Sequence, residues 1–164
     1  MKGYQSWITL LGRLILGGTL LAAGFLKIGN PHDAAASVRV YELLPVSLAN
    51  TLGYSLPWIE IGLALFLIFG IWVRQVAITS GALMAIFIVA IGQAWIRKLP
   101  INCGCFGNGG ITADGKVHGL TYFTEIVRDF ALVAIAYYLY RFPQGKLGLD
   151  KFSIEDLEES KQGE

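Results

Sequence analysis

Residues 75–96 read QVAITSGALMAIFIVAIGQAWI and contain no charged side chain. A helix that crosses the apolar core of a bilayer needs about 20 consecutive, mostly apolar residues, and this stretch is long enough. A helix of a soluble protein would keep a polar face toward water, and this stretch has none. The stretch therefore predicts a membrane-spanning helix.

Three more apolar stretches of similar length lie at residues 7–28, 49–72 and 120–140. Of the 164 residues, 54% are hydrophobic and 15% are charged, and the mean hydropathy is +0.56. This composition is too apolar for a soluble domain of the same size. We therefore expect an all-α fold, a four-helix transmembrane bundle that contacts the lipid bilayer.

Two other interpretations of the composition are set aside. The first stretch does not fit a secretory signal, because Arg13 interrupts its apolar core and the run continues through Phe25 and Leu26. The formal net charge of +1 provides no basic surface, so we expect no nucleic-acid partner.

The connections between the spans differ in character. Residues 30–48 mix apolar and charged side chains, which predicts a short helix lying on the membrane surface. Only a tight turn around Arg74 joins the second and third spans, so these two should be antiparallel neighbours. The glycine-rich connection of residues 97–119 should lie on the same membrane face as the first. We expect a membrane domain over residues 1–145 and a polar cytoplasmic tail over residues 146–164.

Both cysteines of the chain lie in one string of the third connection, Cys103-Gly104-Cys105-Phe106-Gly107. A disulfide needs Cα atoms about 4.4–6.8 Å apart, and two residues separated by one other reach that range only in a bent or half-extended backbone. Gly104 provides the freedom to bend. The small ring would be strained and therefore easier to reduce, which suits a bond that opens and closes in turnover.

The orientation follows from the cysteines and not from the charges. Lysine and arginine residues near the span ends are equally numerous on the two sides, so the positive-inside rule gives no answer. A pair that cycles through a disulfide belongs outside the reducing cytosol. We expect a multi-pass protein of the inner (cell) membrane with both termini in the cytoplasm and the cysteine loop outside.

Charged residues inside the apolar stretches mark the interior of the bundle. Each costs roughly 2.5–3.5 kcal/mol near the middle of a membrane, so these side chains should face other helices and pair. The charged residues concerned are Arg13, Lys27, Glu60, Glu125, Arg128 and Asp129. Pairing that only fixes helix register is an open alternative for Arg13 and Asp129. We expect Lys27, Glu60, Gln93, Glu125 and Arg128 to support the cysteines, by stabilising a thiolate, carrying protons or holding a quinone headgroup.

Several strings together resemble the MauE and DoxX-like family of four-span membrane proteins, which includes methylamine-utilisation MauE. The strings are Arg13-Leu14-Ile15-Leu16-Gly17, Ala23-Gly24, Lys27-Ile28, Tyr41-Glu42-Leu43-Leu44-Pro45, Leu56-Pro57-Trp58-Ile59-Glu60 with Gly62, Cys103-Gly104-Cys105-Phe106-Gly107 and Arg128-Asp129. They are spread over residues 8–140. The resemblance implies a redox-associated membrane protein that helps partner proteins to form or maintain disulfides, beside thioredoxin-like partners.

Four functions remain open from the residues. The first is a membrane thiol-disulfide oxidoreductase that uses Cys103 and Cys105 with a thioredoxin-like or other disulfide-containing extracytoplasmic partner, with a quinone as the candidate cofactor. The second is a binding site for copper(I), zinc or a sulfur species made by Cys103, Cys105 and His118, with His32 as a further ligand. The third is an assembly scaffold with a permanent disulfide. The fourth is a transporter, which with four spans would have to form a homo-oligomer.

Overall fold

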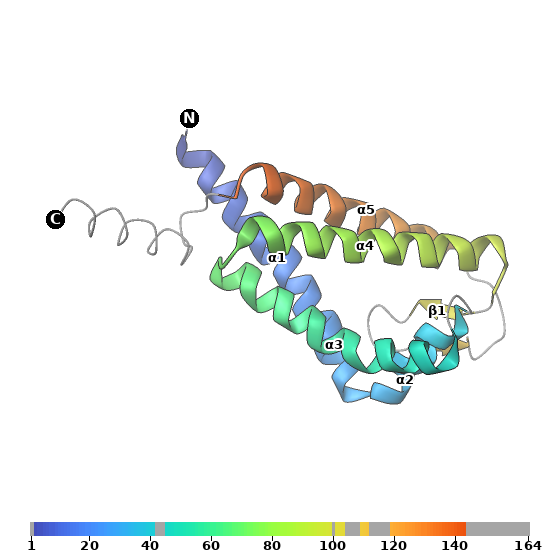
Figure 1. The fold of residues 1–164 in the computed structure, drawn as a ribbon. Coiled ribbons are helices and arrows are strands. Elements are labelled where there is room, and N and C mark those ends of the chain that lie inside the picture. Colours follow the sequence, from blue (N-terminus) through green and yellow to red (C-terminus); the bar gives the residue numbers. More distant parts are fainter. Residues whose placement is uncertain (1, 42–44, 100, 104–108, 112–118, 144–164) are drawn as a thin grey trace.

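The computed structural model describes residues 2–41, 45–99, 101–103, 109–111 and 119–143. Within them the chain forms five helices and two short strands. In order they are α1 (Lys2–Gly29), α2 (Pro31–Val40), α3 (Val46–Phe69), α4 (Val73–Ile96), β1 (Ile101–Cys103), β2 (Gly109–Ile111) and α5 (Gly119–Arg141). The helices α4 and α5 run side by side, α1 and α3 run obliquely to them, and α2 and the strands lie at the end away from the N-terminus (Figure 1).

The long helices pack as two close pairs, α1 with α3 and α4 with α5. The contacts between the pairs, α1 with α5 and α3 with α4, are much sparser. Small residues bring the first pair together, because a Cβ atom at Gly24 would lie 2.6 Å from Ile61 Cγ1 and 3.0 Å from the Pro57 carbonyl oxygen. Arg13, Gly17, Gly24 and Lys27 therefore lie on the face of α1 that meets α3.

The second expected stretch is shorter at its C-terminal end than its hydropathy indicates. It ends at Phe69 and not at residue 72, because Gly70 takes a left-handed conformation with φ of 70°. Gly70 N–H and Ile71 N–H then donate to carbonyl oxygens of the last helical turn, which is a common way to end a helix. Three residues separate α3 from α4, so the expected tight turn between these helices is confirmed.

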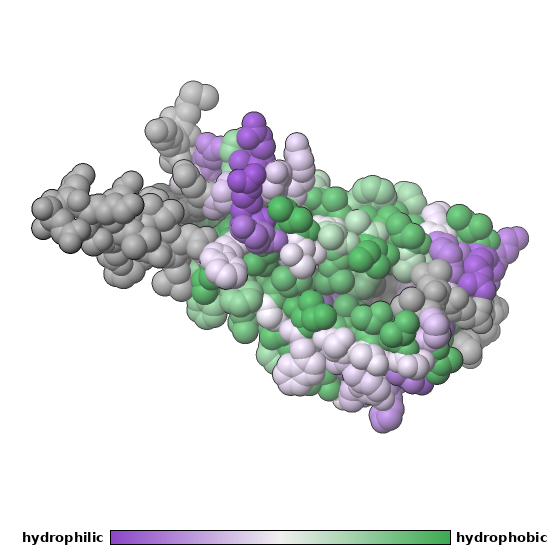
Figure 2. Space-filling view, in the orientation of Figure 1, coloured by the Kyte–Doolittle hydropathy of each residue, from purple (hydrophilic) through white to green (hydrophobic). Residues whose placement is uncertain are grey.

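The outer surface fits a membrane environment. Figure 2 shows apolar side chains over the middle of the molecule and hydrophilic ones toward its ends. Three helical segments are long and apolar enough to cross a membrane, Tyr4–Gly29, Val46–Phe69 and Val73–Ile96. The expectation of helices with the length and apolar composition of membrane spans is confirmed for these three. The helix α5 carries more charge than they do, at Glu125, Arg128 and Asp129.

The first and third connections contain local structure at the same end of the molecule. The short helix expected in the first connection is present as α2, which packs on α3 and on both strands. The strands pair antiparallel, with Ile101 opposite Ile111 and Cys103 opposite Gly109. The expected all-α class is confirmed for the helical body of the chain, and this short hairpin is an addition to it. Isoleucines at the outer pair of positions favour strand pairing, whereas the glycines of this segment conceal the pattern.

Candidate functional site

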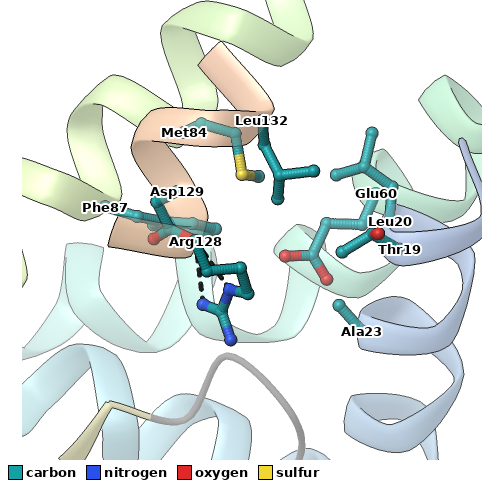
Figure 3. A pocket seen from close by; sticks show the side chains of 9 residues that line it. All are labelled: Thr19, Leu20, Ala23, Glu60, Met84, Phe87, Arg128, Asp129 and Leu132. Carbon is teal, nitrogen blue, oxygen red and sulfur yellow. Dashed lines mark hydrogen bonds and ion pairs between the residues drawn. The ribbon is translucent and has the colours of Figure 1, made fainter. Parts of the chain in front are cut away.

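A small cavity lies between the two helix pairs. Its lining residues are Thr19, Leu20, Ala23, Glu60, Met84, Phe87, Arg128, Asp129 and Leu132, which come from α1, α3, α4 and α5. Figure 3 shows the carboxylate of Glu60 and the side chains of Arg128 and Asp129 facing one another, with Met84 and Leu132 closing one side. The cavity volume is about 20 Å³, which is space for about one water molecule.

One ion pair joins the first helix pair beside this cavity. The Lys27 ammonium group on α1 donates to Glu60 Oε1 on α3 at 2.5 Å, and only 4% and 0% of the two side chains are exposed. The ammonium group also lies 5.3 Å from the centre of the Phe87 ring on α4, a favourable place for a cation. The sequence-predicted residues Lys27 and Glu60 are therefore brought together. Each neutralises the charge of the other at a buried position that bulk water does not reach.

A second ion pair lies across the cavity on α5. Arg128 donates to the same oxygen of its neighbour, Asp129 Oδ1, from Nε at 3.0 Å and from an Nη atom at 2.8 Å. The Asp129 side chain is 1% exposed and that of Arg128 is 30% exposed. The cavity thus has one ion pair on each side, one from each helix pair.

The two carboxylates of these ion pairs share a feature. In the described part of the chain, Glu60 Oε2 and Asp129 Oδ2 are buried and have no hydrogen-bond partner. A buried acceptor without a partner costs roughly 1–3 kcal/mol, and more when it is charged. Each of these oxygens belongs to a residue that lines the cavity, and buried polar groups without a partner are often satisfied by a bound water or ion.

Asp129 was missing from the expected supporting set, although the signal was present in the sequence. It lies four residues after Glu125 and one after Arg128, so all three occupy one side of a helix. Sequence reasoning left open whether Arg13 and Asp129 only pair with other charges and fix helix register. In the structure Arg13 instead donates to the carbonyl oxygens of Leu67 and Ile68 at 2.8 and 2.9 Å.

Gln93 has a different environment from the other supporting residues. Its Nε2 atom donates to the Tyr41 carbonyl oxygen at 3.0 Å, just after the end of α2. This contact ties the α2 end to α4, and Gln93 does not line the cavity. Glu125 lies one helical turn from Asp129 and does not line the cavity either. The structure therefore brings together Lys27, Glu60 and Arg128 of the expected set, and adds Asp129.

The cysteines are only partly within the described residues. The backbone of Cys103 ends β1 beside Gly109, and Cys105 lies outside the described residues. His118, which belongs to the alternative metal set, lies outside them as well. The His32 ring is close to the Tyr54 hydroxyl, at 3.3 Å from Nδ1. Among the described residues, no group of three or more His, Cys, Asp or Glu side chains could hold a metal ion.

Comparisons with known proteins identify relatives along most of the chain. A family described as methylamine utilisation protein MauE matches residues 5–142. A protein of Methylorubrum extorquens with that name, Methylamine utilization protein MauE, is 33% identical over 103 residues, which are 62% of this chain and 55% of that protein. The protein of the same name from Paracoccus denitrificans is 28% identical over 98 residues, 59% of this chain and 53% of that protein.

The two matches cover only part of each relative. The chain spans about half the length of the curated relatives that it matches. No solved structure matches the chain.

Proposed function

The chain belongs to the family of methylamine utilisation protein MauE, and from this premise we propose that it is a membrane thiol-disulfide redox protein. Cys103 and Cys105 form and break a disulfide in exchange with a thioredoxin-like or other disulfide-containing protein outside the cytoplasm. The observation that carries the proposal is that the chain's only two cysteines are separated by a single residue, with the Cys103 backbone at the end of a strand that packs on α2.

The position of Cys103 supports this chemistry. Its backbone lies at the last described ladder position of β1, opposite Gly109, and the cysteines are separated by a glycine. A continued strand would hold residues two apart at roughly 6.6 Å, which is the upper part of the range for a disulfide. A bend at Gly104 would shorten this distance, so the disulfide and the dithiol would favour different backbone shapes.

We also propose that α5 is a fourth span. It has 23 residues, which is long enough to cross a membrane, and it packs closely along α4 (Figure 1). Its charged Asp129 faces the bundle interior, while large apolar side chains face outward. The outward residues are Leu120, Phe123, Val127, Phe130 and Tyr137. In this arrangement both termini share one side, the cytoplasmic one, and the cysteine segment lies on the other.

The buried charges have a role in this proposal as carriers of protons. When the dithiol is oxidised by a membrane quinone, two electrons and two protons leave the sulfur atoms and convert the quinone to a quinol. Glu60 and Glu125 can pass protons within the bundle, with Lys27 and Arg128 as the cations beside this site, because carboxyl groups held near cations inside a membrane commonly serve this purpose. The cavity volume of about 20 Å³ gives room for about one water molecule, which supports proton transfer over quinone binding as the role of this cluster.

The process served by the chain is proposed from its relatives. Both carry methylamine utilisation in their names, and we propose that this chain serves the same process. Deleting its gene should stop growth on methylamine while growth on other nutrients continues. Growth on methylamine without the gene would separate the thiol chemistry from that process.

Trapping a mixed disulfide tests the thiol proposal. The full chain in nanodiscs, with its cysteines reduced, is mixed with an oxidised thioredoxin-like protein, and the products are separated without reductant. Exchange with wild type should be fast, whereas Cys103→Ser and Cys105→Ser should each lose turnover, and one of them should accumulate a covalent complex with the partner. The double variant Cys103→Ser/Cys105→Ser, which has no thiol, is the negative control. Full exchange in both single variants would overturn the proposal.

A further inference from the structure

We propose that Asp129 belongs to the proton-carrying set, and that a water molecule in the cavity joins it to Glu60. This water donates one hydrogen bond to Glu60 Oε2 and the other to Asp129 Oδ2. A proton then passes between the carboxyl groups, because the water gives one of its protons to one carboxylate as it receives a proton from the other. The water site stands on geometry alone, whereas its use in redox turnover rests on the proposed function.

The geometry supplies both halves of this site. Glu60 is 0% exposed and Asp129 is 1% exposed, both line the same cavity, and each has a buried oxygen without a partner among the described residues. The other oxygen of each carboxylate already accepts from a cation, Lys27 or Arg128. The cavity volume of about 20 Å³ matches one water, and a buried water needs about two to four polar partners.

The charges decide which ligand fits. Lys27 from α1, Glu60 from α3 and the Arg128–Asp129 pair from α5 sum to zero when all are ionised. The cavity lining from α4 consists of Met84 and Phe87, which do not titrate, and Glu125 lies a turn away on α5. A metal ion would add positive charge to a balanced cluster in a medium of low dielectric constant. A neutral molecule with two O–H donors satisfies both oxygens and leaves the balance unchanged.

The site also joins the two halves of the bundle. Glu60 belongs to the α1–α3 pair and Asp129 to the α4–α5 pair, and direct contacts between these pairs are sparse. A bridging water makes the two ion pairs into one hydrogen-bonded network. Asp129 is therefore the residue through which protons reach α5, the helix that also carries Glu125.

The first test detects the water directly. The chain contains two methionines, so labelling methionine methyl groups with ¹³C gives a simple NMR spectrum, in which Met84→Leu identifies the Met84 signal. We expect magnetisation transfer from water to the Met84 methyl group in nanodiscs. Ala23→Val, which fills the cavity, should abolish this transfer, whereas Ala22→Val on the exposed side of α1 should keep it. No transfer in wild type, or full transfer in Ala23→Val, would overturn the water site.

The second test addresses the proton path. Oxidation of the reduced cysteine pair is followed with a short-chain quinone and, separately, with water-soluble glutathione disulfide. Asp129→Asn should slow the quinone reaction by roughly tenfold or more, Asp129→Glu should restore most of the rate, and the glutathione reaction should be unchanged. The exposed carboxylate variant Asp33→Asn is the control.

The outcomes separate the two proposals. Equal slowing of both reactions by Asp129→Asn would show a structural role and overturn the proton path, as would an unchanged quinone rate. If wild type reacts with neither oxidant, the proposed thiol function is overturned. The proposed role of Asp129 in carrying protons during that reaction is then overturned as well. The NMR test still supports or overturns the water site in that case.

Discussion

The ammonium group of Lys27 lies 2.5 Å from Glu60 Oε1, between two helices that also meet through glycine contacts, and both side chains are buried. Removing one partner leaves the other charge buried and uncompensated, which costs roughly 3–5 kcal/mol. Lys27→Met and Glu60→Leu should each lower the free energy of unfolding by about this amount.

The double variant provides the more informative measurement. Because Lys27→Met/Glu60→Leu leaves no buried charge of this pair, it should be far more stable than the sum of the single losses predicts. Denaturation of the four proteins in mild detergent completes the double-mutant cycle. Arg39→Met, which removes an exposed contact with Asn50, should cost less than about 1 kcal/mol. Additive losses in the cycle would contradict the pairing.

Close approach of α1 and α3 depends on Gly24. Adding a Cβ atom there forces it against Ile61 and the Pro57 carbonyl oxygen, so Gly24→Ala should destabilise the protein by about 1–3 kcal/mol. Gly18 is on the same helix and its added Cβ would meet nothing within 4 Å. Gly18→Ala should therefore leave the thermal midpoint in detergent unchanged or raise it. The account of this interface fails if the two variants shift the midpoint equally.

Substitution of Gly70 should destabilise the protein for two reasons that can be separated. Its φ of 70° is strained for other residues, and a Cβ atom there would collide with the Arg13 guanidinium group. Asparagine tolerates the left-handed conformation but not the collision. We expect Gly70→Ala and Gly70→Asn both to lower the unfolding temperature, and Gly62→Ala, with open space around its Cβ, to have little effect. A normal unfolding temperature for Gly70→Asn would leave backbone strain as the sole cause.

Sequence reasoning succeeded where one physical requirement dominates. Apolar length predicted the three long apolar helices, and the cost of charge in a membrane predicted that Lys27 and Glu60 face the interior. It succeeded less where partners are chosen by three-dimensional packing. Nothing in the spacing of Arg13 indicates that it binds the carbonyl oxygens of Leu67 and Ile68, because those groups are present in every residue.

The cavity shows the same limit. Its lining comes from four helices, and the facing of Glu60 and Asp129 depends on how two helix pairs pack. The short hairpin was missed because three-residue strands rich in glycine carry little alternation of apolar and polar residues. The strands are visible only through their pairing, with Ile101 opposite Ile111.

The central claim is that Cys103 and Cys105 cycle between dithiol and disulfide, and an equilibrium redox titration tests it most directly. The full chain in nanodiscs is equilibrated across a series of glutathione and dithiothreitol buffers, then alkylated and analysed by mass spectrometry. The account predicts a single reversible two-electron transition, within the range of known thiol-disulfide oxidoreductases, that disappears when either cysteine is changed to serine. A pair that stays oxidised in strong reductant, or remains two free thiols in every oxidising buffer, would contradict it.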